Sequence, residues 1–358
     1  MLKMSSNIEK LQKAVGKISD CAIITDEVNR RYFTKMKSSA GTLVIFPEKS
    51  YFIIDFRYIE KAGNIVTDCE VILQDNLFEQ INQLIEKHGA KTLAVDTNTC
   101  TVAQLGSYRE KLNCQVMDSN DFSKAINKIR VIKTPSEIEK IISAQRIAEK
   151  GFEHMLDFIR EGITEREIQL ELDYFMLKNG AEALSFDTIA LSGKNTSLPH
   201  GVPSDKRVEQ GEFVLLDFGA VVDGWHSDMT RTVCVGIPDD EMKKVYDIVL
   251  RAQNTAIEQL KAGIKCSDFD KIARDIIESN GYGKNFGHSL GHGVGMEIHE
   301  SPTASPRSEE ILEENMIVTI EPGIYIENEF GVRIEDFAFV TRDGCVNMTN
   351  APKQLIIL

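Results

Sequence analysis

Residues 287–300 of the chain read Gly-His-Ser-Leu-Gly-His-Gly-Val-Gly-Met-Glu-Ile-His-Glu. This stretch holds three of the seven histidines in the protein, at positions 288, 292 and 299, together with four glycines. His288 and His292 are four residues apart, a spacing that would place both imidazoles on one face of a helix. Each glycine, however, costs a helix about 1 kcal/mol relative to alanine. The stretch therefore predicts a loop or a bent strand whose backbone closely approaches something else.

The composition is typical of a soluble globular protein. A length of 358 residues, with 42% hydrophobic and 27% charged residues, predicts two domains with a core each. The net charge of -14 argues against a nucleic-acid partner, and no apolar run is long enough to span a membrane. Residues 1–7 lack the apolar core of a signal peptide. Seven scattered cysteines without a Cys-x-x-Cys pair are typical of reduced thiols, so we expect a cytoplasmic protein.

The first 125 residues alternate between strand and helix patterns. The apolar pattern of residues 76–88 has helical spacing and stops at Gly89. Short apolar runs between turn residues predict strands of a covered sheet at 21–24, 41–46, 51–54 and 92–96. Residues 1–125 are therefore expected to form a small α/β domain. Because it holds no metal-ligand cluster and no phosphate loop, we expect this domain to cover or assemble the catalytic part.

A basic connector at 127–135 marks the domain boundary, and residues 126–358 form the second predicted domain. A capping box at Ser136-x-x-Glu139 predicts a long helix to about Arg160. A second box at Thr164-x-x-Glu167 opens a helix that ends at Asn179-Gly180.

The same scheme recurs about a hundred residues later, with helices predicted at 240–261 and 267–279. Gly162-Ile163 recurs as Gly263-Ile264, and Asn179-Gly180 recurs as Asn280-Gly281. This repetition predicts an internal duplication, in which two helix-helix-strand halves face each other around a pseudo-two-fold axis. A cleft between such halves is the expected place for a site, although the similarity is weak residue by residue.

Two aspartates lie near a predicted hairpin turn. Asp217 lies in the apolar strand pattern 214–222, which the turn sequence Asp223-Gly224 follows. A two-residue turn there pairs position 217 with 230 and places Asp217 and Asp228 on one sheet face, roughly 7–8 Å apart at the backbone. Two carboxylates on a largely buried face repel each other and need a cation between them. The alternative is an Asp228 that faces solvent.

Two glutamates form a second pair. Glu321 ends the apolar pattern 316–321, and Glu335 lies within the pattern 331–340. Their separation is even, so both face the same side if the segments form a hairpin around Asn328. A lone strand glutamate usually faces solvent, but two of them beside an aspartate pair indicate a shared site.

Four carboxylates and one imidazole from the histidine-rich stretch make an oxygen-rich ligand set. Such a set suits hard divalent ions, above all Mn²⁺, with Co²⁺, Fe²⁺ or Zn²⁺ as alternatives. It does not resemble a structural zinc site, which would use thiolates. Four negative charges balance two divalent ions, and a metal pair can generate a hydroxide that attacks at neutral pH.

The other histidines differ in their surroundings. His200 lies in the loop Pro199-His200-Gly201 and is either a further site residue or an ordinary surface histidine. His226, next to the tryptophan at 225, is expected to pack or to lie at the surface. His88 and His154 lie in helix patterns, and we expect neither to take part in function.

The order of Asp217, Asp228, His292, Glu321 and Glu335 resembles the metallopeptidase family of methionine aminopeptidase, aminopeptidase P and prolidase. The resemblance covers about 135–345 and is carried by the motifs at 216–219, 227–232, 291–295, 319–323 and 332–336, with 186–188 and 199–201. Residues 39–41 and 55–58 are similar to the N-terminal domain of the proline-specific branch. Methionine aminopeptidases generally lack this domain.

The resemblance implies an α+β protein whose C-terminal part has the pita-bread fold, preceded by a creatinase-type α/β domain. It implies that one ion binds Asp217, that the other binds His292 and Glu321, and that Asp228 and Glu335 bridge the two ions. It further implies a homodimer or a higher oligomer.

The resemblance also implies roles around the substrate. Glu321 would act as the general base, and His299 and His200 would hold the substrate carbonyl and amide. His288 would line the proline pocket, and Arg333 would belong to the hydrogen-bond network of the site.

Together with the oxygen-rich ligand set, the resemblance implies a manganese-type dinuclear Xaa-Pro aminopeptidase. Proline lacks an N–H group and is conformationally restricted, so general peptidases handle it poorly. The main alternative is an Xaa-Pro dipeptidase (prolidase), which needs the free carboxylate of a dipeptide. Methionine aminopeptidase and a non-catalytic peptide- or protein-binding module are further alternatives, and the intact ligand set weighs against the module.

Overall fold

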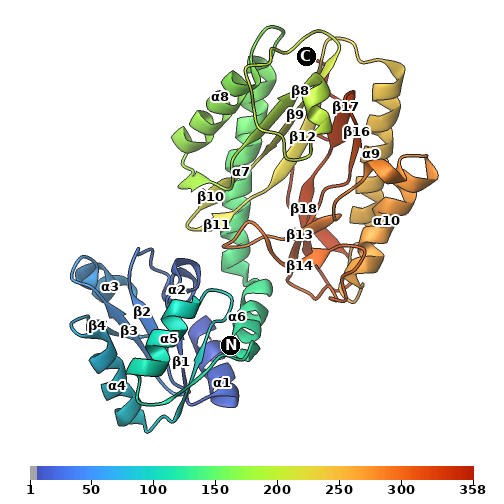
Figure 1. The fold of residues 1–358 in the computed structure, drawn as a ribbon. Coiled ribbons are helices and arrows are strands. Elements are labelled where there is room, and N and C mark those ends of the chain that lie inside the picture. Colours follow the sequence, from blue (N-terminus) through green and yellow to red (C-terminus); the bar gives the residue numbers. More distant parts are fainter. Residues whose placement is uncertain (1–5) are drawn as a thin grey trace. The chain divides into compact units, whose positions relative to one another are not determined.

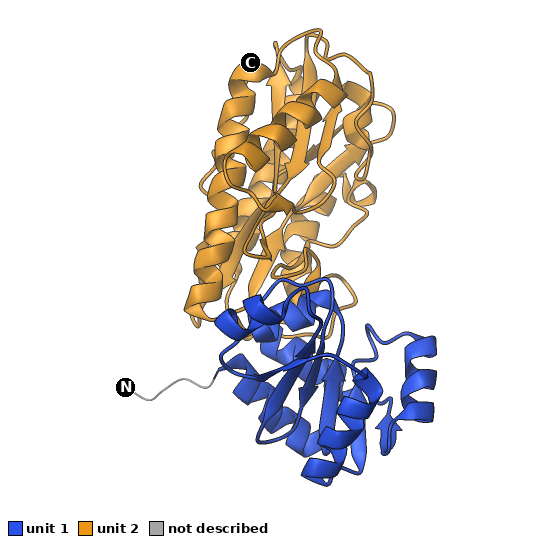
Figure 2. Ribbon diagram, turned by 90° about the vertical axis from the view of Figure 1, so that its left-hand side faces the viewer, with its two compact units in different colours: residues 1–130 blue, residues 131–358 orange. Residues whose placement is uncertain are grey.

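A computed structural model describes residues 6–358. The prediction that residues 1–7 are not a signal peptide falls mostly on residues 1–5, which lie outside the described part. The chain divides after Arg130 into two compact units (Figure 2). This division falls inside the basic connector 127–135. Helix α6 (Asp121–Val131) runs through residue 125, the predicted end of the first domain.

The N-terminal unit contains one six-stranded mixed sheet with the order β4-β3-β2-β1-β5-β6 (Figure 1). Strands β1, β5 and β6 run parallel, and β2 is antiparallel to both of its neighbours. The predicted α/β domain is confirmed. Its elements are α1 (Asn7–Ile18), β1 (Cys21–Ile24), α2 (Glu27–Thr34), β2 (Thr42–Ile45), β3 (Ser50–Ile54), α3 (Ile59–Ile65), β4 (Glu70–Leu73), α4 (Leu77–His88), β5 (Thr92–Val95), α5 (Val102–Lys111), β6 (Gln115–Met117) and α6.

Helix α4 begins and ends where the sequence predicts. The Asn76 side chain accepts a hydrogen bond from the backbone N–H of Glu79, and Gly89 ends the helix with a left-handed φ of 64°. The apolar face of α4 includes Ile81 and Ile85, which belong to the same buried core as the sheet residues.

Two helix pairs carry the C-terminal unit. They are α7 (Pro135–Phe158) with α8 (Glu165–Lys178), and α9 (Asp240–Gln259) with α10 (Cys266–Ser279). The predicted capping box at Ser136 and Glu139 is wrong by two residues. Thr134 is the N-cap, and its backbone N–H donates to the Glu137 carboxylate at 2.7 Å. Pro135 explains the shift, because proline lacks an N–H and has a fixed φ that suits the first helical position. The box at Thr164 is confirmed.

The duplication is visible in the backbone of the two halves. Helices α8 and α10 each have 14 residues, and the second repeats the first at an offset of 101. Gly162 and Gly263 precede them with φ angles of 84° and 88°. Gly162 donates its N–H to the carbonyl of Val208, and Gly263 makes the corresponding bond to Leu312. Equivalent backbone in both halves supports the predicted duplication.

The strands of this unit lie between the two helix pairs (Figure 1). The main sheets have the orders β12-β9-β8 and β14-β13-β15-β18-β19. The remaining elements are β7 (Ala183–Leu184), β8 (Ile189–Ser192), η1 (Gly193–Ser197), β9 (Glu212–Phe218), β10 (Ala220–Val222), β11 (Trp225–His226), β12 (Met229–Val235), η2 (Gly283–Asn285), β13 (Gly291–Gly293), β14 (Glu300–Ala304), β15 (Ile317–Ile320), β16 (Gly323–Ile326), β17 (Phe330–Arg333), β18 (Asp336–Val340) and β19 (Cys345–Asn347).

Both predicted hairpin registers are confirmed. Asp217 pairs with Thr230 across β9 and β12. In the second hairpin Gly323 pairs with Arg333, and Ile320 pairs with Asp336 in the adjoining sheet, so positions 321 and 335 are opposite each other. Asn328 lies in the connecting turn with a φ of 62°. The histidine-rich stretch forms the short strand β13, whose register shifts after His292, as expected for a bent strand.

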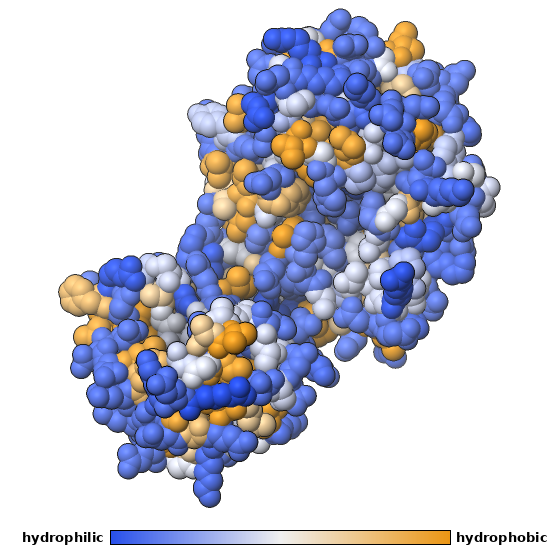
Figure 3. Space-filling model, viewed as in Figure 1, coloured by the Kyte–Doolittle hydropathy of each residue, from blue (hydrophilic) through white to orange (hydrophobic). Residues whose placement is uncertain are grey.

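Most of the surface drawn in Figure 3 is hydrophilic in both units, with small hydrophobic patches. All seven cysteines lie in the described part of the chain and are free thiols, as predicted. Within residues 6–358, no helix is both long and apolar enough to cross a membrane.

A buried arginine joins the two halves of the C-terminal unit. The Arg231 side chain on β12 is 1% exposed, and its Nη2 lies 2.7 Å from Oδ1 of the fully buried Asp336 on β18. Arg231 also donates to the carbonyl oxygens of Glu335, Ala351 and Pro352. Burial alone would raise the pKa of Asp336, but Arg231 and Lys353 hold it below its ordinary value.

Replacing Arg231 with methionine should lower the free energy of unfolding by about 3 kcal/mol or more, because the buried Asp336 then loses its main partner. Lys353, 3.1 Å from the other carboxylate oxygen, keeps the loss from being larger. Urea denaturation measures this. A matched control is Lys271→Met, which breaks the exposed pair with Asp275 and should cost less than about 1 kcal/mol. Equal losses for the two variants would contradict the structural role of Arg231.

Candidate active site

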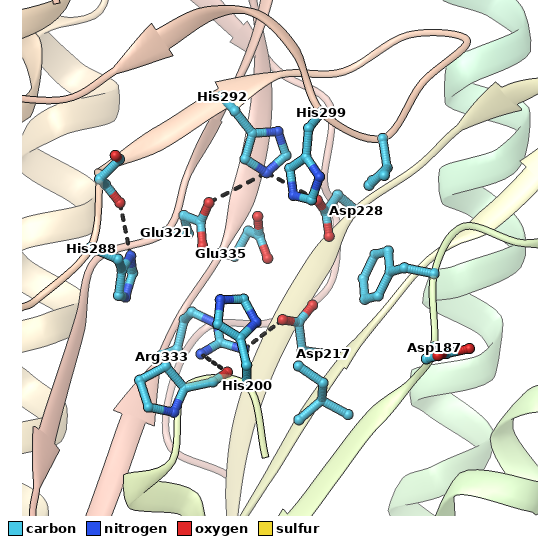
Figure 4. Close-up of a pocket in the computed structure, with 15 residues that line it drawn as sticks. Asp187, His200, Asp217, Asp228, His288, His292, His299, Glu321, Arg333 and Glu335 are labelled. Carbon is cyan, nitrogen blue, oxygen red and sulfur yellow. Dashed lines mark hydrogen bonds and ion pairs between the residues drawn. The ribbon is translucent and has the colours of Figure 1, made fainter. Parts of the chain in front are cut away.

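A cavity of about 390 Å³ lies between the two halves of the C-terminal unit (Figure 4). It contains every site residue that the sequence predicts. The first half contributes Asp217 on β9 and Asp228 directly before β12, together with the loop residue His200. The complete lining is Phe186, Asp187, Ile189, Pro199, His200, Asp217, Asp228, His288, Ser289, His292, Ile298, His299, Glu321, Arg333 and Glu335.

The five predicted metal ligands converge in this cavity. His292 Nε2 lies 3.6 Å from Asp228 Oδ2 and 3.5 Å from Glu321 Oε1. One ligand atom each from Asp228, His292 and Glu335 lies within 4.8 Å of the others. Asp228 and Glu335 are only 4% and 1% exposed. Donor atoms at these separations leave room for a metal ion among them.

His292 presents an unprotonated nitrogen to the carboxylates. Its Nδ1 lies 3.1 Å from the Gly293 carbonyl oxygen, which can only accept, so Nδ1 must carry the proton. Burial lowers the pKa of His292 to about 4, so the ring is neutral at physiological pH. The lone pair of Nε2 therefore points toward Asp228 and Glu321, as a metal ligand requires.

The carboxylates have too few positive partners. Burial, followed by repulsion from Asp217 and Glu321, raises the pKa of Asp228 well above its ordinary value. Burial, followed by repulsion from Asp228, Glu321 and Asp217, raises the pKa of Glu335 well above its ordinary value. Burial, with repulsion from Asp217, raises the pKa of Glu321 to about 8, even though Arg333 opposes this shift.

The Oδ1 atom of Asp217 is buried without a hydrogen-bond partner, and its other oxygen lies 2.5 Å from Arg333 Nη2. An oxygen left unpaired in a buried acidic cluster costs free energy unless a cation binds it. The donor set therefore fits divalent metal ions.

Hydroxyl groups orient the two glutamates. Thr230 donates its hydroxyl to Glu335 at 2.7 Å, and Thr319 donates to Glu321 at 3.3 Å. Thr319 also accepts the backbone N–H of His292 at 3.0 Å, so one threonine ties two predicted ligands together. Neither threonine was predicted from the sequence as a site residue.

A directed chain of hydrogen bonds runs from Arg333 to His288. The Nδ1 of His288 must donate to the Ser289 carbonyl at 2.8 Å, which leaves Nε2 as an acceptor. Tyr325 donates its hydroxyl to that Nε2 at 2.9 Å and accepts from Arg333 at 2.7 Å. Burial, followed by repulsion from Arg333, lowers the pKa of His288 to about 4. His288 is therefore a neutral, fixed wall of the cavity.

Tyr325 was missed from the sequence because no motif marks it. The signal that could have indicated it is the pair of glycines around it. A Cβ atom at Gly323 would lie 2.4 Å from the Tyr325 hydroxyl, and one at Gly331 would lie 2.8 Å from its ring. The glycines thus make room for this side chain.

Of the five remaining histidines, all in the described part of the chain, His200 and His299 line the cavity, whereas His88, His154 and His226 do not. The ring of His299 packs edge-on against His292 with centroids 4.4 Å apart, and His200 lies on an exposed loop at the cavity (Figure 4). Leu198 and Val202 on the same loop are also exposed, at 55% and 79% of their residue surface. His226 is not part of the cavity lining, and its backbone N–H donates to the Gly295 carbonyl.

Residues 139–342 match metallopeptidase family M24, and residues 8–132 match the creatinase/prolidase N-terminal domain. This chain belongs to metallopeptidase family M24. Family membership implies that it binds divalent metal, in agreement with the donor set of the cavity. The predicted family, the α+β class, the pita-bread fold and the metallopeptidase class are confirmed.

Relatives of this M24 protein match along almost the whole chain. The Bacillus subtilis (strain 168) protein "Uncharacterized peptidase YqhT" is 42% identical over 98% of this chain and 99% of its own. The structure of an Xaa-Pro dipeptidase from Bacillus anthracis is 42% identical with a TM-score of 0.95, and the match covers 98% of this chain and 99% of that one. An X-Pro aminopeptidase from Thermotoga maritima MSB8 is 35% identical with a TM-score of 0.90, over 97% and 100% of the two chains.

Metal binding should stabilise the protein more at high pH than at low pH. The pKa of Glu321 in the folded, metal-free protein, about 8, lies above its ordinary 4.5. Protonated Glu321 therefore stabilises the metal-free fold at low pH, and this contribution is lost as the pH rises through 8. Metal ions need the ionised ligand and compete with the proton.

We expect saturating Mn²⁺ to raise the melting temperature by at least about 3 °C more at pH 8 than at pH 5.5. Differential scanning calorimetry of EDTA-treated and reloaded protein measures this difference. The variant Glu321→Gln, which cannot titrate, should reduce the pH dependence. A metal-induced shift that is the same at both pH values would contradict the proposed competition.

Proposed function

We propose that the protein is a dinuclear Xaa-Pro aminopeptidase, which hydrolyses the bond between an N-terminal residue and a following proline. The observation that carries this proposal is the convergence of four carboxylates, two of them buried, and a neutral imidazole in one cavity. Membership of family M24 and the similarity to the Thermotoga maritima X-Pro aminopeptidase support it.

The proposed ligands divide the cluster between two ions. Asp217 would hold one ion, His292 and Glu321 would hold the other, and Asp228 with Glu335 would hold both. When bound, such a metal pair supplies a water acidic enough to attack a peptide carbonyl at neutral pH.

Glu321 would take the proton from the attacking water as the hydroxyl oxygen bonds to the carbonyl carbon. The proton would then pass to the proline nitrogen as the C–N bond breaks. Glu321 suits this role because Thr319 orients its carboxylate at the cavity wall.

The histidines would hold the substrate. His299 and His200 would donate to the carbonyl oxygen and contact the amide, stabilising the charge that develops on the oxygen. His288, neutral and fixed by Tyr325, would line the proline subsite, with the apolar Phe186 and Ile189 also in the lining.

The charge of the lining favours substrates longer than a dipeptide. Among the described residues that line the cavity, the only basic side chain of the lysine or arginine type is that of Arg333. Its guanidinium already contacts Asp217, Thr230 and Tyr325. The lining of this chain thus offers no further side chain of that kind for the C-terminal carboxylate of an Xaa-Pro dipeptide. The second candidate remains an Xaa-Pro dipeptidase, because a relative with that name is 42% identical.

Peptide assays distinguish the candidates. We expect Mn²⁺-dependent, EDTA-sensitive release of the first residue from Xaa-Pro-Yaa peptides, with slower cleavage of Xaa-Pro and no cleavage of Met-Ala-Yaa. Cleavage of the dipeptide alone would identify a dipeptidase instead. Cleavage of Met-Ala-Yaa would favour a methionine aminopeptidase, and no cleavage of any peptide would favour a binding module.

The substitution Asp228→Asn should lower kcat/KM by more than about 100-fold, because it removes a charge that both ions need. Loss of a residue that only hydrogen-bonds to a metal ligand typically lowers activity roughly 10–100-fold. Loss of a ligand itself should lower activity at least as much. Asp223→Asn is a matched control: Asp223 has a left-handed φ of 52°, which asparagine tolerates, at the exposed hairpin turn five residues away. A near-normal rate for Asp228→Asn would refute the ligand assignment.

Three further properties are part of the proposal. The oxygen-rich donor set supports Mn²⁺ as the physiological ion. Free thiols at all seven cysteines support a reducing, cytoplasmic location. We also propose a homodimer, as the family resemblance implies; sedimentation at several protein concentrations tests it.

A further inference from the structure

A buried ion pair lies directly beside His299. Nζ of Lys133 is 2.9 Å from Oε2 of Glu300, and the two side chains are 1% and 3% exposed. Glu300 is the residue after His299 and the first residue of β14, whereas Lys133 precedes α7. The two residues are thus far apart in the sequence and form their ion pair outside the cavity lining.

The carboxylate of Glu300 fills the inside of the turn that leads to His299. Its Oε1 accepts the backbone N–H of Glu297 at 3.1 Å. A Cβ atom at Gly295 would lie 2.4 Å from Oε2 of Glu300, so the carboxylate occupies the space that a side chain at 295 would need. The glycine in the sequence is therefore required by the close approach of a charged group.

Both ends of the turn are fixed to the body of the unit. Gly295 accepts the backbone N–H of His226 at 2.9 Å, and Glu300 pairs with Gly293 of β13. Lys133 is itself fixed, because its backbone N–H donates to the Asn315 carbonyl at 2.9 Å. The ion pair thus connects a stationary residue to the segment that carries His299.

A buried ion pair is weak evidence for a stabilising role, because replacing both partners with apolar residues is often neutral. Its fixed geometry is more informative. The ring of His299 packs against the proposed ligand His292, so a small shift of the turn would move this ring relative to the bound substrate (Figure 4).

We infer that Lys133 and Glu300 are positioning residues that hold the turn 295–300 so that His299 is aimed at the substrate carbonyl. This inference rests on the proposed role of His299 in peptide hydrolysis. Lys133 neutralises Glu300, and Glu300 in turn holds the backbone of the turn. Neither residue lines the cavity, so their effect on catalysis would pass through His299.

The test is a double-mutant cycle with His299. Lys133→Met should lower kcat on an Xaa-Pro-Yaa peptide by roughly 10–100-fold, since a displacement of about 1 Å at a reacting group can cost about 100-fold. In a His299→Ala background, the same substitution should lower kcat less than about 2-fold, because the positioned side chain is gone. Mn²⁺ affinity, measured by titration calorimetry, should remain that of the unsubstituted protein.

Two further variants keep the test decisive. Glu300→Gln retains the size of the side chain and replaces Lys133→Met if the latter does not fold. Lys206→Met is the control, because it breaks a partly buried pair with Glu212 (2.6 Å) in the same unit, outside the cavity lining, and should leave kcat unchanged. Equal losses from Lys133→Met with and without His299 would overturn the inference, as would no loss in the active protein.

Crystal structures separate a failure of this inference from a failure of the proposed function. In the Lys133→Met variant, the His299 ring should be displaced while His292 keeps its place. An unmoved His299 would overturn the inference, whatever the protein hydrolyses. A displaced His299 in a protein that cleaves no Xaa-Pro peptide would support the positioning role and refute the proposed activity.

Discussion

Mutual repulsion among four carboxylates is the constraint on which the C-terminal unit depends. Asp217, Asp228, Glu321 and Glu335 line one small cavity, and burial together with repulsion raises the pKa values of three of them. A fold can hold such a cluster only if other contacts fix its walls. Hydroxyl donors and Arg333 satisfy some of the oxygens, and divalent ions, which the family membership implies, would satisfy the remainder.

Apolar cores on both sides hold the walls of this cavity. One buried cluster joins α7 and α8 to β9 and β12, and another joins α9 and α10 to β15 and β18 and also includes Phe213 of β9 and Cys234 of β12. Apolar contacts therefore connect the two halves beside the polar cavity. Arg231 links the halves by its bond to Asp336, and Thr230 of the first half receives the backbone N–H of Glu335 from the second. Apolar packing and the Arg231–Asp336 pair thus fix the walls of the cavity that holds the carboxylates.

Two backbone carbonyls determine which ring nitrogen of His288 and of His292 carries the proton. The carbonyls of Ser289 and Gly293 each accept from an imidazole Nδ1, which fixes the tautomers of His288 and His292. His292 then offers a lone pair to the acidic cluster, whereas His288 accepts from Tyr325. His292 thus faces acidic side chains, whereas His288, in the same short stretch, lies close to Arg333. The close backbone approaches that the glycines permit make this arrangement possible.

The sequence by itself determined the element types, the duplication, the hairpin registers and the four candidate carboxylates, whereas the choice of His292 among the histidines came from the family resemblance. These properties follow from local patterns, because side-chain direction alternates along a strand and caps mark helix ends. The pairing of position 217 with 230 follows from the turn residues, and that of position 321 with 335 follows from their even separation in the sequence. Only the tertiary structure decided that Tyr325 connects Arg333 to His288 and that Lys133 reaches Glu300, 167 positions away. Such contacts depend on the distances between elements that are remote in the chain, and no local pattern encodes those distances.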